Sequence, residues 1–118
     1  MRPNRAAEET RHEVAATVEA VSSASTLMRV TGHLDLATAR HFAAALAEVI
    51  TTRRPNVVID ASGLGFCDSA GLAALEMAGA LAETCGGTVT VTRPRPGVAR
   101  LLRITGLDSR FLRAAPAA

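Results

Sequence analysis

The segment Cys67-Asp68-Ser69-Ala70-Gly71 holds the residues of this chain that are best placed to do chemistry. It is superficially similar to the G-x-S-x-G nucleophile elbow of hydrolases, in which a strand-to-helix turn presents a reactive serine. Cys67 replaces the first glycine, and the three histidines, at positions 12, 33 and 41, all precede Ser69, whereas that fold places its histidine after the nucleophile. Since a serine without a positioned base is a weak nucleophile, the sequence does not favour an enzyme.

Motifs for a nucleotide or a metal are also weak. The third glycine of a G-x-G-x-x-G loop starting at Gly63 would fall on Asp68, and a G-x-x-x-x-G-K-[ST] loop is impossible because the chain has no lysine. His33 and His41 lie eight residues apart, without a cysteine or acidic cluster at metal-ligand spacing. We therefore expect no cofactor and no metal.

Ser69 leaves two interpretations open because it lies where a loop turns into a helix. As a structural residue it would be the helix N-cap, with its oxygen accepting a main-chain N–H of the first turn. As a functional residue it would accept a phosphate, since the free N–H groups and the dipole of a helix start favour an anion. Asp68 would repel that phosphate and leave part of its charge unneutralised.

Hydrophobic periodicity predicts strands and helices that position this segment. Alternation of period two indicates a hairpin of strands at 13–20 and 26–31, and Gly32-His33-Leu34-Asp35 is expected to break the second strand. Helices, the first with Thr38 as N-cap, are expected at 38–52, 69–84 and 97–104. Further strands are expected at 57–60, 88–92 and 111–112, with a loop at 61–67. This order predicts an α/β domain with a small mixed, mostly parallel sheet.

Composition narrows the classes of protein further. Of 118 residues, 48% are apolar but only three are aromatic, which disfavours both disorder and the binding of single-stranded nucleic acid by base stacking. A net charge of +2 gives no electrostatic argument for nucleic acid, although six arginines gather in residues 93–118. No apolar run is long enough to span a membrane, and the two cysteines form no CxxC pair, so we expect reduced thiols and a cytoplasmic protein. We expect one domain at 13–113, between a disordered tail at 1–12 and a C-terminal tail at 114–118.

Four segments in a fixed order carry a resemblance to a known family. They are TGHLDLATA at 31–39, VVIDASGLGFCDSAGLAAL at 57–75, GGTVTV at 86–91 and VARLLRITGLDSRF at 98–111. Each is weak alone, but together they make the chain from about Glu13 to Leu112 similar to the STAS-domain family of anti-sigma factor antagonists. The resemblance implies a single STAS-like domain with helices packed mainly on one side of its sheet.

The resemblance also implies a function for Ser69. In the D-S-x-G motif of that family, the matching serine is phosphorylated by the anti-sigma factor, which is itself a serine kinase, and a PP2C-type serine phosphatase removes the phosphate. The unphosphorylated antagonist binds the anti-sigma factor and frees the sigma factor. Many relatives read D-S-S-G, whereas this chain has Ala70 at the second serine, which leaves the phosphate acceptor intact. Asp35, in the G-x-L-D segment at 32–35, is expected near Ser69.

We expect the partner to dock on a face around Ser69. The other residues expected on that face are Asp35, Phe66, Cys67, Asp68, Ala70 and Leu72, whereas Leu64 and Met77 are expected in the core. Two other non-enzymatic functions stay open, namely a scaffold in a stressosome-like assembly and a STAS subunit of a membrane-associated complex. The basic segment at 93–113 is the one sequence feature that favours the membrane-associated complex.

Overall fold

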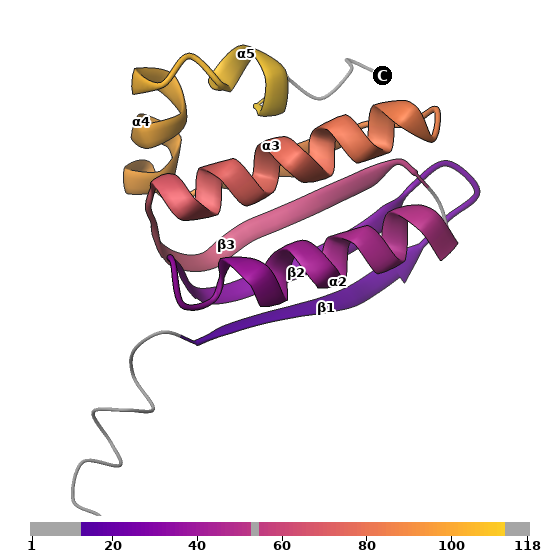
Figure 1. The fold of residues 1–118 in the computed structure, drawn as a ribbon, viewed down its shortest axis with the longest axis horizontal. Helices are drawn as coiled ribbons and strands as arrows, with labels where there is room; N and C mark the ends of the chain where they lie inside the picture. Colours follow the sequence, from indigo (N-terminus) through magenta and orange to yellow (C-terminus); the bar gives the residue numbers. More distant parts are fainter. Residues whose placement is uncertain (1–12, 53–54, 113–118) are drawn as a thin grey trace, which may run out of the picture.

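The structure, a computed structural model, describes residues 13–52 and 55–112, so the tails expected at 1–12 and 114–118 lie outside the described residues. Strands come first along the chain and then alternate with helices (Figure 1). The elements are β1 Val14–Val21, β2 Thr26–Leu34, α2 Ala39–Thr52, β3 Val57–Cys67, α3 Ser69–Thr84, β4 Val89–Thr92, α4 Pro96–Ile104 and α5 Asp108–Phe111.

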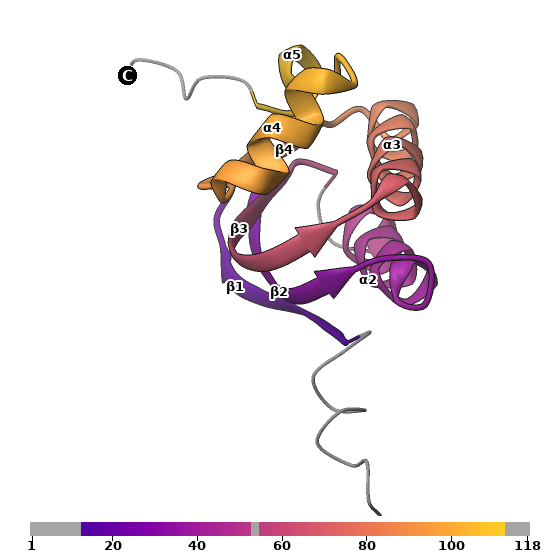
Figure 2. The ribbon, with the colours of Figure 1, turned by 90° about the vertical axis from the view of Figure 1, so that its left-hand side faces the viewer.

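The four strands form one mixed sheet in the order β1-β2-β3-β4, which is also their order along the chain. β1 pairs antiparallel with β2, and the other two pairings are parallel. The helices gather on one side of this curved sheet (Figures 1 and 2). The predicted small mixed, mostly parallel sheet with helices mainly on one side is therefore confirmed. No helix in the described ranges is long and apolar enough to cross a membrane.

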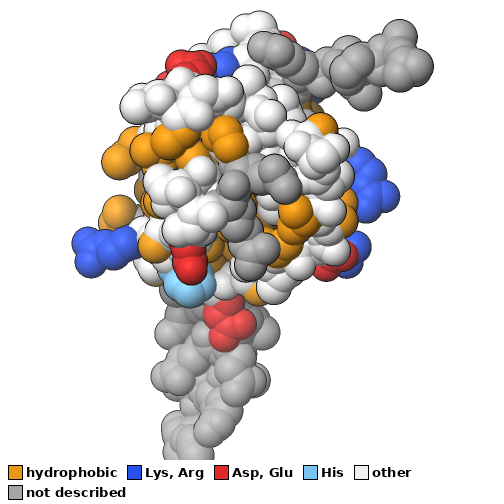
Figure 3. Space-filling model, turned by 90° about the vertical axis from the view of Figure 1, so that its right-hand side faces the viewer, with side chains coloured by type: hydrophobic (Ala, Val, Ile, Leu, Met, Phe, Trp, Pro, Cys, Tyr) orange, Lys and Arg blue, Asp and Glu red, His pale blue; other side chains and the backbone are white. Residues whose placement is uncertain are grey.

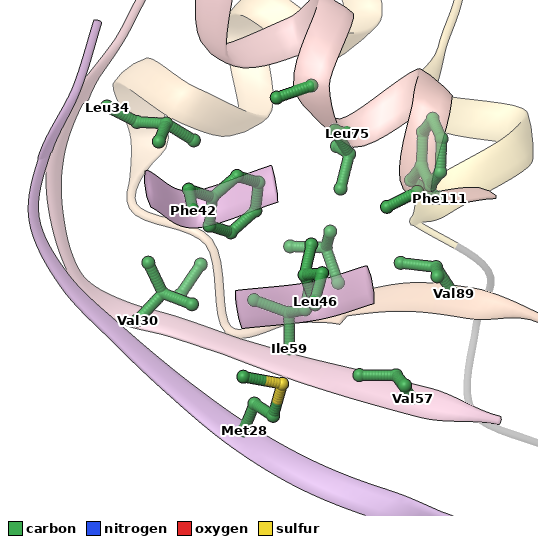
Figure 4. Close-up of a cluster of buried hydrophobic side chains, with 14 of the residues drawn as sticks. Met28, Val30, Leu34, Phe42, Leu46, Val57, Ile59, Leu75, Val89 and Phe111 are labelled. Atoms are coloured by element: carbon green, nitrogen blue, oxygen red, sulfur yellow. The ribbon is translucent and has the colours of Figure 1, made fainter. Parts of the chain in front are cut away.

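The hydrophobic core fills the space between the sheet and the helices. Because side chains alternate between the two faces of a strand, every second strand residue faces this core. Alternate side chains of β2 and β3 point toward α2 and α3 (Figure 4), namely those of Met28, Val30, Val57 and Ile59. Phe42 and other apolar side chains of the helices pack against them. Burying a side chain of this kind stabilises the fold by about 1.5–3 kcal/mol relative to leaving it exposed. Leu64, which we expected in the core, is indeed buried.

β3 is longer than predicted, because the expected loop at 61–67 is part of the strand. The pairing with β2 shifts register twice, once between Asp60 and Gly63 and again between Leu64 and Phe66. At each shift β3 contains one more residue than β2, which is the pattern of a β-bulge. The serine and glycines that indicated a loop therefore lie at bulges in a continuous strand.

β2 also continues past the predicted break and runs to Leu34. Gly32 permits this, since its φ is +103° and a Cβ there would lie 2.3 Å from the Glu13 carbonyl oxygen. Only glycine can adopt that backbone conformation beside β1 without strain. The strand thereby carries Asp35 to the end of the sheet where β3 also finishes.

Two predictions near the helices are wrong. The strand expected at 111–112 is instead the end of the short helix α5, in which the N–H of Phe111 donates to the Leu107 carbonyl oxygen and the ring is buried. A phenylalanine and a leucine alone do not distinguish a strand from an apolar helical turn. Met77, expected in the core, is 68% exposed on α3, because the residues of that helix that face the sheet are mostly alanine, leucine and glycine.

Candidate functional site

The site is built at the edge where the parallel strands β2 and β3 both end, seen facing the viewer in Figure 2. Leu34 and Cys67 are paired at the last position of the two strands. One residue further along, the N–H of Asp68 donates to the Leu34 carbonyl oxygen at 3.1 Å. The turn after β2, which contains Asp35, and the turn that begins α3 at Ser69 are thus held side by side.

Asp68, and not Ser69, is the N-cap of α3. Its carboxylate accepts hydrogen bonds from the N–H groups of Ala70 at 2.9 Å and Gly71 at 3.2 Å. Ser69 is the first residue of the helix and is exposed, and its hydroxyl makes no hydrogen bond within the described part of the chain. The interpretation of Ser69 as a helix cap is therefore wrong, and its hydroxyl is available to an external group.

Gly71 lets the two turns approach each other closely. A Cβ at this position would lie 2.7 Å from Leu34 Cγ, 2.9 Å from Cys67 Sγ and 3.0 Å from the Leu34 carbonyl oxygen. Real Cβ atoms do not occur at such distances, so the first turn of α3 packs against the end of β2 only because residue 71 has no side chain. The glycine of the D-S-x-G motif thereby holds the start of α3, which contains Ser69, close to the end of β2.

Asp35 organises the second turn of the site and the start of α2. Its Oδ1 accepts hydrogen bonds from the N–H groups of Ala37 at 2.9 Å and Thr38 at 3.2 Å. The Thr38 hydroxyl accepts from the Asp35 N–H at 2.9 Å and donates to the His33 carbonyl oxygen at 2.8 Å. The side chain expected to be the N-cap, Thr38, therefore ties the turn together, while the carboxylate of Asp35 binds the N–H groups before the helix.

Most of the other residues expected on the partner-binding face reach the surface. Phe66 is 49% exposed, and Cys67, Asp68 and Ala70 are half-buried. Leu72 is only 6% exposed and packs in the core, so a partner cannot reach it in this structure. The exposed part of the predicted face thus consists of a hydroxyl, two carboxylates, an aromatic ring and small side chains.

The Cys67 thiol is not suited to act as a nucleophile. Burial, together with the nearby charge of Asp68, raises its pKa to about 11, so the reactive thiolate is scarce near neutral pH. Both cysteines are free thiols. The described residues also contain no group of three or more His, Cys, Asp or Glu side chains that could hold a metal ion.

Two residues that we did not expect on this face lie beside it. The His33 ring meets the Phe66 ring edge-on, with centroids 6.3 Å apart and an interplanar angle of 83°. Arg95 donates from Nε to the Ser62 carbonyl oxygen at 3.1 Å, which brings its guanidinium to the last part of β3. The alternation of arginine and proline at 93–96 was the available signal for Arg95, since the two prolines restrict the backbone on both sides of it.

The opposite end of the molecule, where α2 and α3 finish, has a different character. Hydrophobic side chains are spread over it among uncharged ones, and most charged side chains lie toward its margins (Figure 3). Val21, at the end of β1, is 49% exposed. The Asp35 and Asp68 carboxylates and the exposed Ser69 hydroxyl lie instead at the end where β2 and β3 finish.

Comparisons with known proteins identify what this arrangement is similar to. Residues 17–114 match the family model described as "Mlab, STAS domain". The structure of the anti-sigma factor antagonist SpoIIAA in its unphosphorylated form is similar with a TM-score of 0.72 and 21% identity, covering 86% of this chain and 90% of that one. No curated protein matches the chain.

Two further solved structures extend this likeness. The structure of an anti-sigma factor antagonist from Mycobacterium paratuberculosis is similar with a TM-score of 0.67 and 29% identity. The matched region covers 85% of this chain and 84% of the antagonist. The Bacillus cell fate determinant SpoIIAA in the phosphorylated form has a TM-score of 0.65 and 20% identity, covering 86% of this chain and 93% of its own. The fold of this chain is therefore that of anti-sigma factor antagonists.

Proposed function

The chain belongs to the STAS-domain family, and from this premise we propose that it is a non-enzymatic anti-sigma factor antagonist switched by phosphorylation of Ser69. The unphosphorylated form binds an anti-sigma factor serine kinase through the face around Ser69 and thereby releases a sigma factor. Phosphorylation by that kinase ends the binding, and a PP2C-type serine phosphatase restores it. The protein works in the cytoplasm and touches no nucleic acid itself.

The observation that carries this proposal is the division of roles between Asp68 and Ser69. Because the Asp68 carboxylate occupies the N–H groups of Ala70 and Gly71, the exposed Ser69 hydroxyl has no structural duty in the helix. A kinase can modify it without removing a cap. The start of a helix also tolerates an added anion, which the dipole favours by about 0.3–1 kcal/mol.

The same geometry explains why the added phosphate would act on binding. Phosphorylation adds about −1.5 to −2 charges at pH 7 to an edge that already carries Asp35 and Asp68. Docking would remove water from this concentrated negative charge, which costs several kcal/mol where the partner supplies no compensating charge, and about 1.4 kcal/mol is tenfold in affinity. This exceeds the benefit from the helix dipole, so the fold is retained while the affinity for the partner falls.

The decisive experiment is incubation with candidate anti-sigma factor kinases and ATP, followed by mass spectrometry of the modified site. We expect one phosphate, on Ser69, and no labelling of Ser69→Ala. Ser62→Ala is the matched control, because Ser62 is the nearest other serine in the sequence and lies in β3, the strand that leads to α3. Full labelling of Ser69→Ala would overturn the assignment. A large particle in size-exclusion chromatography, with no kinase binding, would favour the scaffold function instead.

A further inference from the structure

Arg95 is held in a fixed position beside the candidate site. It lies between Pro94 and Pro96, which restrict the backbone, and it adopts the extended conformation with φ −67° and ψ 158° just before α4. The hydrogen bond from its Nε to the Ser62 carbonyl oxygen fixes the guanidinium plane against β3. Because this hydrogen bond already restrains the exposed side chain, less conformational entropy is lost when it binds a ligand than for an arginine without such a bond.

Next to this guanidinium, Gly65 has no side chain, and we use the word notch for the small exposed surface that it leaves between Arg95 and His33. Gly65 is exposed and is the extra residue at the second bulge of β3. A Cβ at Gly65 would lie 3.8 Å from Arg95 Nη1, 3.8 Å from His33 Cδ2 and 3.8 Å from the Gly32 carbonyl oxygen. A side chain at Gly65 would therefore be in ordinary contact with a guanidinium on one side and an imidazole on the other. Bulges occur often beside binding and active sites.

The charge of Arg95 is not compensated within the described residues. Arg93 pairs with Asp60 at 2.7 Å and Arg110 pairs with Glu83 at 3.6 Å, whereas Arg95 has no acidic partner in the described part of the chain. With Nε bonded to a carbonyl oxygen, the terminal nitrogens remain as donors in a planar pair. That geometry matches a carboxylate, which binds arginine through two parallel hydrogen bonds.

We propose that the notch formed by Arg95, His33 and Gly65 binds a carboxylate from an acidic segment of the protein partner. This inference rests on the proposed function, since the partner is the anti-sigma factor that docks on the Ser69 face. The notch continues that face, because the His33 ring contacts Phe66 and the two residues are paired across β2 and β3. Figure 2 shows α4, which follows Arg95, at the same end of the molecule as the start of α3.

A protein partner fits this surface better than an anionic membrane does. Asp35 and Asp68 lie at the same edge, two residues beyond His33 and Phe66 respectively. A uniformly negative lipid surface that approached Arg95 would be repelled by these two carboxylates. A protein can present an acidic group to Arg95 and an uncharged group to the aspartates, so the charges on this surface set the orientation in which it docks.

The test is an NMR titration of the full chain with an acetylated hexaglutamate peptide as the probe. We expect shifts of the Arg95 Nε–H and the Gly65 amide, with affinity reduced roughly tenfold in Arg95→Gln. Gly65→Ala should fold normally, because 3.8 Å is an ordinary contact distance, and its methyl group should block the notch. Arg103→Gln removes the same charge from an exposed residue of α4 that makes no ion pair among the described residues, and it should retain the affinity.

Two parallel titrations distinguish other ligands. Stronger binding of inorganic phosphate than of the peptide would overturn the proposal in favour of a phosphate site. Binding to vesicles of phosphatidylcholine with phosphatidylglycerol, lost in Arg95→Gln, would overturn it in favour of a membrane. The absence of shifts at Arg95 and Gly65 with the peptide would also overturn it.

A final arm separates this inference from the proposed function. The unphosphorylated chain and its Arg95→Gln variant are titrated with the anti-sigma factor kinase that phosphorylates Ser69. Binding of both forms with equal affinity refutes the role of Arg95 and leaves the proposed function intact. Weaker binding of Arg95→Gln than of Arg103→Gln supports the notch, whereas failure of the unmodified chain to bind refutes the proposed function itself.

Discussion

The carboxylate of Asp60 and the guanidinium of Arg93 lie 2.7 Å apart, joining the first bulge of β3 to the residue that follows β4. The Asp60 side chain is almost fully buried, and its other carboxylate oxygen accepts the N–H of Ser62 at 3.0 Å. Arg93 adopts φ 55°, an uncommon conformation for a residue with a side chain. The pair therefore links the bulge to the loop that leads to Arg95.

The first prediction concerns the pH dependence of this ion pair. The hydrogen bond from Arg93, followed by that from the Ser62 N–H, holds the pKa of the Asp60 carboxyl well below its usual range. Because this pKa is lowered by folding, ionised Asp60 stabilises the fold above about pH 4, and the contribution is lost as the pH falls toward the folded-state pKa. We expect Arg93→Ala to lower the Tm at pH 7, and the difference from the unmodified chain to shrink below about pH 4.

Circular dichroism is the suitable measurement for these melts, because the chain has no tryptophan or tyrosine. Arg103→Ala serves as the control for loss of an exposed arginine. A Tm difference for Arg93→Ala that stays constant across the acid range would contradict the assigned role of Asp60.

A second prediction compares two glycines in helices. Gly71→Ala should reduce the free energy of unfolding by about 1–3 kcal/mol, because the new methyl group would collide with Leu34 and Cys67. Gly97→Ala, where no atom lies within 4 Å of the added Cβ, should instead increase it by about 0.4–1 kcal/mol. Urea denaturation measures both values. Equal effects of the two substitutions would show that Gly71 has no role in close packing.

A third prediction separates the structural role of Asp35 from a role in partner binding. Asp35→Ala removes the acceptor of two N–H groups and should cost about 1 kcal/mol of stability. Asp35→Asn keeps an acceptor oxygen at that position and removes the charge, so we expect it to retain the Tm and to lower the rate of Ser69 phosphorylation. An unchanged phosphorylation rate in Asp35→Asn would mean that Asp35 serves only the turn.

A fourth prediction distinguishes a switch of binding from a switch of folding. Phosphate on Ser69 should leave the amide NMR spectrum of β2 and β4 unchanged, because the residue is exposed at a helix start. Affinity for the anti-sigma factor, measured by calorimetry, should fall at least about tenfold. Ser69→Asp should reproduce this only in part, since a carboxylate carries less charge than a phosphate. Equal affinity of both forms would refute regulation at Ser69.

A fifth prediction uses the two cysteines as an internal comparison. The pKa of Cys67 is raised to about 11 by its burial, and Cys85 is exposed at the end of α3. Iodoacetamide at pH 8 should therefore modify Cys85 well before Cys67 in the folded protein, and both should react in denaturant. Mass spectrometry of peptides over time measures the two rates. Comparable rates in the folded protein would contradict the buried position of Cys67.

The sequence predicted α3 from Ser69 to Thr84 correctly, because polar residues precede it and Gly86 follows it. Of the two interpretations of Ser69 that it left open, the one in which Ser69 caps that helix is wrong. Asp68 and Ser69 are both good capping residues, and their order alone does not show which one adopts the extended backbone of an N-cap. The structure shows that Asp68 does, with φ −118° and ψ −167°.

The prediction of a loop at 61–67 was wrong for a related reason. Serine and glycine are typical of turns, which is how Ser62, Gly63 and Gly65 indicated a loop. The same residues are tolerated at bulges inside a strand that is hydrogen-bonded to a neighbouring strand. The pairing with β2, which is a long-range contact, decides between the two. The position of the Arg95 side chain could not be predicted for the same reason, because its hydrogen bond to Ser62 joins residues 33 positions apart.

The order of the strands in the sheet has a consequence for how the chain folds. Since the sheet order β1-β2-β3-β4 is the order of synthesis, each strand pairs with the one made just before it, and none has to be inserted between two earlier strands. The entropy cost of bringing distant segments together is correspondingly small, because no strand pairing within residues 13–52 and 55–112 spans more than one intervening helix. The sheet can therefore grow strand by strand from the β1–β2 hairpin, and the turns that carry Asp35 and Ser69 can form before α4 has left the ribosome.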